Sequence, residues 1–136
     1  MVYTNFDCNN TFNIHNESSL QKMIVRYLRQ TDLLFTGTLG GYLETDMARI
    51  NAVSEGYGGN FKKGIPDLII FSPSPCGKYN GMAIELKHPR AGVGKVSKEQ
   101  LQWLDKLEVE SKYFCMISNS YDEVLETIVR YMHGIL

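Results

Sequence analysis

The sequence is poor in cysteine, proline and tryptophan, with three, four and one of these among its 136 residues. The cysteines, Cys8, Cys76 and Cys115, are odd in number and lack the short spacings of zinc ligands, so they predict neither a disulfide framework nor a zinc site. No apolar run approaches the ~20 residues that a membrane-spanning helix needs. Residues 4–19 lack the charged start and apolar centre of a signal peptide. We therefore expect an intracellular protein without a membrane partner.

The net charge of −1 does not by itself indicate a polyanionic partner. The charges are unevenly distributed, however: residues 62–99 carry seven Lys or Arg against three acidic residues, and the remainder carries seven basic and twelve acidic residues. This basic surplus indicates a surface that attracts a phosphate backbone, although such clusters also occur on solvated faces. The candidate nucleic-acid-binding residues are Lys62, Lys63, His88, Arg90, Lys95 and Lys98.

Two neighbouring strands are predicted inside this basic stretch. Residues 68–71 are apolar without alternation, which is typical of a strand covered on both faces. Residues 82–87 alternate, so Glu85 and Lys87 point to the same face. The turn-rich connection at 72–81 is too short for a parallel crossover, and we expect the two strands to be antiparallel.

Asp67 lies at the mouth of the first of these strands and joins Glu85 and Lys87 as a candidate catalytic set. Two carboxylates from different strands can hold Mg²⁺ or Mn²⁺, and a nearby lysine can orient a water molecule or stabilise charge on a phosphate. In the alternative interpretation, Glu85 and Lys87 are solvated and Asp67 merely follows a proline in a turn. The ordered set of three residues favours the metal site.

Helical periods flank these strands. Asn16 is a candidate N-cap, and Ser97 and Ser120 each begin a capping box with Gln100 and Glu123. The expected inward faces are Leu20, Met23, Ile24, Tyr27 and Leu28 in the first helix, Leu101, Leu104 and Leu107 in the second, and Val124, Leu125, Ile128, Val129 and Met132 in the last. A short strand at 33–36, a helix at 46–55 that ends at Gly56, and a buried strand at 113–117 complete the pattern.

Two further polar residues each have two interpretations. The spacing of Glu17 puts it on the inward stripe of the first helix, where a carboxylate needs a partner, but a glutamate in a first turn also favours the helix dipole. Gln100 closes the capping box of Ser97, and this role competes with a role in the active site.

The order of elements predicts an α/β fold. Two adjoining strands followed by a helical crossover to a third indicate a mixed central sheet flanked by helices. We expect a single domain over residues 1–136, with residues 1–15 as an irregular arm. The glycine-rich loop at 37–41 lacks a nucleotide-binding fingerprint, and no organic small-molecule cofactor is expected.

Three short motifs carry a family resemblance: Gly64-Ile65-Pro66-Asp67, Glu85-Leu86-Lys87 and Ser97-Lys98-Glu99-Gln100. In this order the sequence resembles the PD-(D/E)XK nuclease superfamily and, within it, the short free-standing VRR-NUC domains of phages and other viruses. The resemblance implies an αβββαβ restriction-endonuclease-like core, with Asp67, Glu85 and Glu17 as metal ligands, Lys87 as the catalytic lysine and Gln100 in the catalytic set. Leu39 departs from the family pattern, since a polar residue is expected there.

The resemblance also implies a function. It indicates a metal-dependent endonuclease that hydrolyses phosphodiester bonds in DNA during replication, recombination or repair, with branched or Holliday-junction DNA as a candidate substrate. It further implies a homodimer that places two sites across two strands, in the cytoplasm or nucleus of a host cell. The alternative is a non-catalytic nucleic-acid-binding module on the same scaffold, or a protein-interaction domain. Two carboxylates beside a polyanion argue against mere binding.

Overall fold

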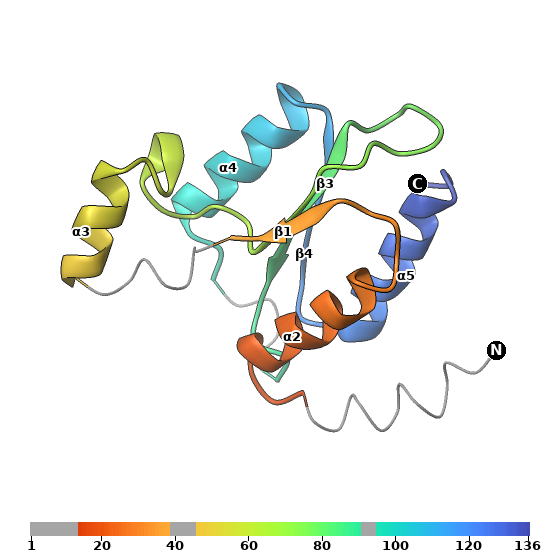
Figure 1. Cartoon of the computed structure of the whole chain (residues 1–136), viewed down its shortest axis with the longest axis horizontal. Coiled ribbons are helices and arrows are strands. Elements are labelled where there is room, and N and C mark those ends of the chain that lie inside the picture. The colour runs from red at the N-terminus through yellow and green to blue at the C-terminus, as the bar shows by residue number, and fades with distance from the viewer. Residues whose placement is uncertain (1–13, 39–45, 91–94) are drawn as a thin grey trace.

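The computed structural model describes residues 14–38, 46–90 and 95–136, and Figure 1 shows its elements. In chain order these are α2 (Glu17–Leu28), β1 (Phe35–Gly37), α3 (Asp46–Ser54), the 3₁₀-helix η2 (Gly59–Phe61), β2 (Leu68–Ile70), β3 (Gly81–Leu86), α4 (Lys98–Val109), β4 (Tyr113–Ser118) and α5 (Tyr121–Met132). The predicted arm up to residue 13, the glycine-rich loop from Leu39, and positions 91–94 of the basic stretch lie outside the described residues.

The four strands form one mixed sheet in the order β1-β2-β3-β4. β2 pairs antiparallel with both β1 and β3, whereas β3 and β4 run parallel because α4 provides the crossover between them. The predicted α/β class, the αβββαβ order and the antiparallel pair are therefore confirmed. α3 is inserted between β1 and β2, and α5 follows the core (Figure 1).

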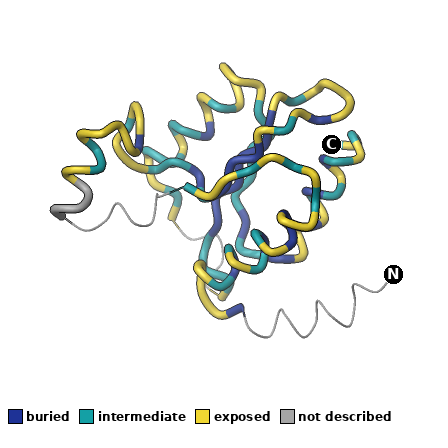
Figure 2. Tube along the Cα trace, viewed as in Figure 1, coloured by how far each residue is buried: buried dark blue, intermediate teal, exposed yellow. Residues whose placement is uncertain are grey.

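The alternation of β3 separates two packing layers. Met82, Ile84 and Leu86 belong to one hydrophobic cluster with buried residues of α2 and α5. Glu85 points to the opposite layer, where α4 packs against β4 and contacts Glu85 through a hydrogen bond. Figure 2 shows the buried part of the trace concentrated in the central strands. The two faces of β3 therefore serve different purposes: one builds the core and the other presents a carboxylate to α4.

The predicted helix starts are confirmed, with one difference. Asn16 accepts a hydrogen bond from the Ser19 backbone N–H, and Ser97 forms a complete capping box with Gln100. Ser120 accepts a bond from the Glu123 N–H, but its own N–H donates to the Ser118 hydroxyl at 3.1 Å. The second capping box is therefore half formed, because Ser118 has replaced the expected partner.

The predicted inward faces of α2 and α5 agree with the structure. Their buried members are Leu20, Ile24, Tyr27, Leu28, Val124, Leu125 and Ile128, and Met23, Val129 and Met132 pack against them half-buried. α3 begins at the predicted residue and ends at Ser54, one residue before the predicted end, and Gly56 follows at φ 99°. Across the described ranges, every helix is too short or too polar to traverse a bilayer.

Several predicted burials are wrong, and each error has a local cause. Phe71 is 46% exposed because β2 ends at Ile70. Leu101 is 53% exposed because α4 turns Leu104 toward β4 instead. β4 is half-buried except at Ser118, since it lies at the edge of the sheet. The first strand begins at Phe35 rather than two residues earlier.

Replacing Ile24 with Ala should lower the free energy of unfolding by about 2–5 kcal/mol, because it leaves a cavity between α2 and α5 where the side chain is fully buried. Ile50→Ala, in α3, is the matched control, since its side chain is 60% exposed and the loss should stay within about 0.5 kcal/mol. Urea unfolding followed by circular dichroism measures both. Equal losses in the two variants would contradict the assigned core.

Candidate active site

The register of β2 and β3 brings Asp67 and Glu85 together. Leu68 pairs with Ile84, so Asp67, one residue before β2, lies across from Glu85. Directly opposite residues of antiparallel strands have Cβ atoms about 4.5–5.5 Å apart and side chains on the same face. The two carboxylates are therefore neighbours at the end of β3 that faces α4.

Asp67 is fixed by the backbone around it. Its Oδ2 atom accepts a hydrogen bond of 2.7 Å from the Leu86 N–H. On the other side, the Thr38 N–H donates to the Asp67 carbonyl at 2.9 Å, and the Thr38 hydroxyl donates to the Pro66 carbonyl at 2.6 Å. Burial raises the pKa of Asp67; the Leu86 N–H opposes this rise and the charge of Glu17 adds to it.

Gln100, in the first turn of α4, holds both Glu85 and Lys87. Its Nε2 donates to Glu85 Oε1 at 2.7 Å, and its Oε1 accepts from Lys87 Nζ at 3.0 Å. The same Oε1 accepts the Ser97 backbone N–H at 2.9 Å, which closes the capping box. The two interpretations of Gln100 are therefore compatible, because one amide caps the helix and contacts two side chains of the predicted catalytic set.

Lys87 lies just past β3, and its side chain is only 12% exposed. Its Nζ donates to the Lys95 carbonyl at 3.1 Å and lies 4.0 Å from Glu85 Oε1. Its backbone N–H donates to the Ser118 carbonyl at 2.9 Å, at the end of β4. The ammonium therefore stands beside Glu85, on the face that the alternation predicted.

Glu85 is 4% exposed, and its second oxygen, Oε2, is buried without a hydrogen-bond partner in the described part of the chain. Burial raises the pKa of Glu85 to about 8; the charge of Asp67 adds to this rise, and Lys87 opposes it. A buried carboxylate oxygen without a donor is costly. Two neighbouring carboxylates with such an oxygen fit a hard divalent cation, which prefers oxygen ligands.

Glu17 is exposed, although its spacing predicted a place on the inward stripe of the first helix. It lies in the first turn of α2, where its side chain reaches solvent at the end of the sheet. Its charge raises the pKa values of Asp67 and Glu85, so it lies within electrostatic reach of both. Among residues 14–38, 46–90 and 95–136, no three His, Cys, Asp or Glu side chains form a metal-binding group. The role of Glu17 as a third ligand stays a prediction.

Gly64 is the residue of the Gly-Ile-Pro-Asp motif that contacts α4. Its φ of 85° is a left-handed value that glycine adopts readily. A Cβ atom at this position would lie 2.7 Å from the Gln100 backbone nitrogen and 2.7 Å from the Glu99 carbonyl carbon. Glycine therefore allows the segment before β2 to approach the start of α4, and this approach brings Asp67 and Gln100 to one site.

The predicted nucleic-acid-binding residues lie around the start of α4 and after β3. Lys63 forms an ion pair with Glu99 at 3.9 Å, and His88 Nδ1 accepts the Arg90 backbone N–H at 3.1 Å. His88 is half-buried, whereas Lys62, Lys63, Arg90, Lys95 and Lys98 are exposed. Their contacts with nucleic acid stay predictions.

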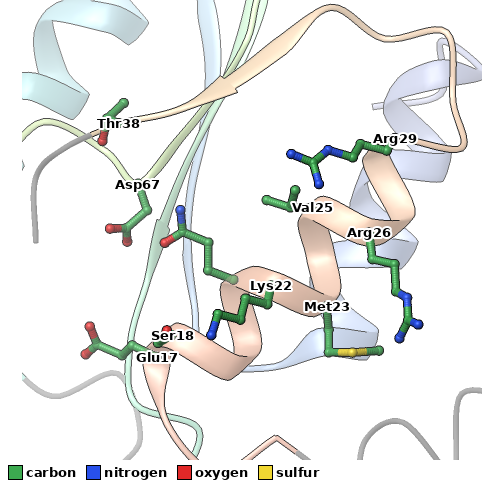
Figure 3. Close-up of a pocket in the computed structure, with 10 residues that line it drawn as sticks. Glu17, Ser18, Lys22, Met23, Val25, Arg26, Arg29, Thr38 and Asp67 are labelled. Atoms are coloured by element: carbon green, nitrogen blue, oxygen red, sulfur yellow. The ribbon is translucent and has the colours of Figure 1, made fainter.

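A groove of about 800 Å³ runs from Asp67 along α2 (Figure 3). Its acidic end holds Glu17 and Asp67. Three basic residues are also part of its lining: Lys22 and Arg26 in α2, and Arg29, the residue that caps the C-terminus of α2. These cations lie outside residues 62–99, so a count of charge along the chain misses them. Their spacing of four and three residues places them on one helix face, and this was the available signal.

Comparisons with known proteins agree on one family. The family model described as VRR-NUC domain matches residues 15–118. A solved structure titled "VRR_NUC domain protein" superposes with a TM-score of 0.62 at 19% sequence identity, covering 88% of this chain and 89% of that chain. At this identity the structural likeness shows the fold. No curated protein matches the sequence.

The pKa of Glu85 predicts how stability depends on pH when divalent cations are absent. The ordinary value of 4.5 rises to about 8 in the folded protein, so the folded state binds the extra proton between these pH values. The free energy of unfolding should therefore fall as pH rises from about 5 to 8 and level off above. Urea unfolding in chelator, compared with Glu85→Gln at each pH, isolates this contribution. A wild-type free energy of unfolding that stays constant or rises relative to that of Glu85→Gln over this pH range would contradict it.

Replacing Gly64 with Ala should destabilise the protein more than replacing Gly56 with Ala. Both glycines have a positive φ, 85° and 99°, so each variant loses about 1–2 kcal/mol from backbone strain. Only the Cβ at Gly64 meets α4, whereas nothing lies within 4 Å of the one at Gly56. The Gly64 variant should lose about 1–3 kcal/mol more in free energy of unfolding. Equal losses would show that α4 does not constrain this position.

Proposed function

This chain belongs to the VRR-NUC domain family of PD-(D/E)XK-type nuclease domains, and from this premise we propose that it hydrolyses phosphodiester bonds in DNA with the help of a divalent cation. The observation that carries the proposal is the pair of carboxylates at the end of β3, in which Glu85 Oε2 is buried without a donor among the described residues. An oxygen buried without a donor is costly, and a bound cation would offset that cost.

Asp67 and Glu85 are the residues that hold Mg²⁺ or Mn²⁺ in this proposal. When bound, the cation lowers the pKa of a coordinated water and offsets the charge that develops on the phosphate. Asp67 already uses Oδ2 to accept the Leu86 N–H, and this bond orients its carboxylate toward Glu85. Glu17, exposed in the same groove, supplies further negative charge to attract the cation.

Lys87 acts on the attacking water or on the charge of the phosphate. Its ammonium is largely buried, and Gln100 and the Lys95 carbonyl restrain it at 3.0 and 3.1 Å. A preoriented cation in a site that excludes water stabilises developing charge more strongly than a mobile surface lysine does. Gln100 is a positioning residue, since it contacts both Glu85 and Lys87.

The finer features of the proposal come from the family resemblance. We include branched or Holliday-junction DNA as the substrate, because such DNA brings two scissile strands together. A homodimer would present one active site to each of them. The predicted nucleic-acid-binding residues would contact the backbone near the scissile phosphate: Lys62, Lys63, His88, Arg90, Lys95 and Lys98.

Lys87→Met should reduce the rate of DNA cleavage at least about 100-fold while DNA binding is largely retained, because the substitution removes charge stabilisation at the reacting phosphate. Nicking of supercoiled plasmid and cleavage of a synthetic four-way junction, with Mg²⁺ and Mn²⁺, measure the rate. Lys106→Met, on the exposed surface of α4, is the matched control and should cleave normally.

Two outcomes would reject the proposal. Cleavage by the Lys87 variant at the wild-type rate would remove Lys87 from the mechanism. A wild-type protein that binds DNA tightly in chelator, yet cleaves neither substrate with either cation, would favour the non-catalytic binding module.

A further inference from the structure

Three exposed cations form a stripe along the solvent face of α2 and its C-cap: Lys22, Arg26 and Arg29, which we call the α2 stripe. Each residue advances a helix by about 100°, so spacings of four and three residues keep these side chains within one narrow sector. The opposite sector carries Leu20 and Ile24, which are fully buried. The α2 stripe is therefore rigidly held, because the core fixes the helix that presents it.

The residues of the α2 stripe form no ion pair within the described part of the chain. The ion pairs there are Lys63–Glu99, Lys87–Glu85 and Lys106–Glu110, and none includes a residue of the stripe. Cations in the last turn of a helix favour its dipole, which gives Arg26 and Arg29 a structural role. Lys22 lies in the middle of α2, where the dipole does not explain it.

The α2 stripe shares one groove with the candidate active site. The groove that contains Asp67 and Glu17 continues along α2 past Lys22 to Arg29. In Figure 3, the Arg29 and Lys22 side chains extend toward the side of α2 on which Asp67 lies, and Arg26 extends away from it along the helix surface. A DNA strand that runs from Asp67 along this groove therefore passes from its acidic end to the part that is lined by basic side chains.

The length of the stripe matches a short run of a DNA strand. With a rise of about 1.5 Å per residue, Lys22 and Arg29 are about 10 Å apart along the helix axis. Successive phosphates of one strand of B-DNA advance about 3.4 Å, so this length spans about three phosphates. Three cations along it can each neutralise one phosphate.

From the groove, the charges and this spacing, we infer that the α2 stripe binds the phosphodiester backbone of the DNA strand on one side of the scissile phosphate. The choice of DNA as the ligand rests on the proposed function. It assigns a contact surface separate from Lys62, Lys63 and the chain after β3. The acidic end of the groove repels a phosphate when no cation is bound, so the stripe supplies the attraction that holds the strand in place.

The test measures DNA binding rather than cleavage. The triple variant Lys22→Gln, Arg26→Gln, Arg29→Gln is compared with wild type by fluorescence anisotropy of a labelled DNA duplex, in EDTA, over a series of KCl concentrations. If each cation neutralises one phosphate, the slope of log K against log salt should become shallower by about 2.7 in the variant. Affinity at low salt should fall at least about tenfold.

A matched control removes the same charge elsewhere. Lys106→Gln, Lys112→Gln, Arg130→Gln replaces three exposed cations outside the groove and should leave the slope close to wild type. Thermal unfolding of both triple variants is measured in parallel. If the stripe acts only on the helix dipole, its removal lowers the stability of the protein and leaves the slope unchanged.

Equal slopes in the two variants, or a wild-type protein that does not bind the duplex, would overturn the inference. Binding that depends on the stripe, in a wild-type protein that does not cleave with Mg²⁺ or Mn²⁺, would reject the nuclease proposal and leave this contact surface standing.

Discussion

The pairing of β2 with β3 forces two carboxylates of like charge into one partly buried place, and the surrounding structure follows from this constraint. Asp67 lies across from Glu85 in the antiparallel register, and burial together with mutual repulsion raises the pKa of Glu85 to about 8. Burying two carboxylates side by side costs free energy, and the neighbouring hydrogen bonds offset part of it. The Leu86 N–H donates to Asp67, and the Gln100 amide donates to Glu85. Glu85 Oε2, which has no hydrogen-bond partner among the residues that the structure describes, marks where a cation would complete the arrangement.

The start of α4 links helix formation to the geometry of the site. Gln100 Oε1 accepts both the Ser97 N–H of the capping box and the Lys87 ammonium, so the amide cannot rotate without losing one of them. Gly64 sets how closely the segment before β2 approaches this same turn. A displacement of α4 by a fraction of an ångström would therefore change the Gln100, Glu85 and Lys87 contacts together. Because one helix terminus performs both tasks, the precision of the site depends on the stability of its first turn.

Local patterns predicted what depends on local geometry. The alternation of β3 put Glu85 and Lys87 on one face, the short connection predicted antiparallel strands, and Asn16 marked the start of α2. Features that depend on how helices pack against the sheet were not predictable from local patterns. The period of α4 correctly predicted that Leu104 is buried but did not reveal that Leu101 is exposed, since that depends on how the helix rotates over β4. The α2 stripe was missed because its cations become part of the site only when the fold places α2 beside Asp67.

The division of the sheet into two faces explains how this domain can tolerate an unfavourable site. One face of β3 contributes Met82, Ile84 and Leu86 to the cluster with α2 and α5, where burial of apolar surface stabilises the fold. The other face carries Glu85, whose ionisation opposes folding near neutral pH when no cation is bound. Because successive side chains of one strand point in opposite directions, the stabilising and the destabilising residues share the same backbone. The packing of the core therefore keeps β3 in place and Glu85 buried. A cation that binds this carboxylate would also stabilise the folded chain.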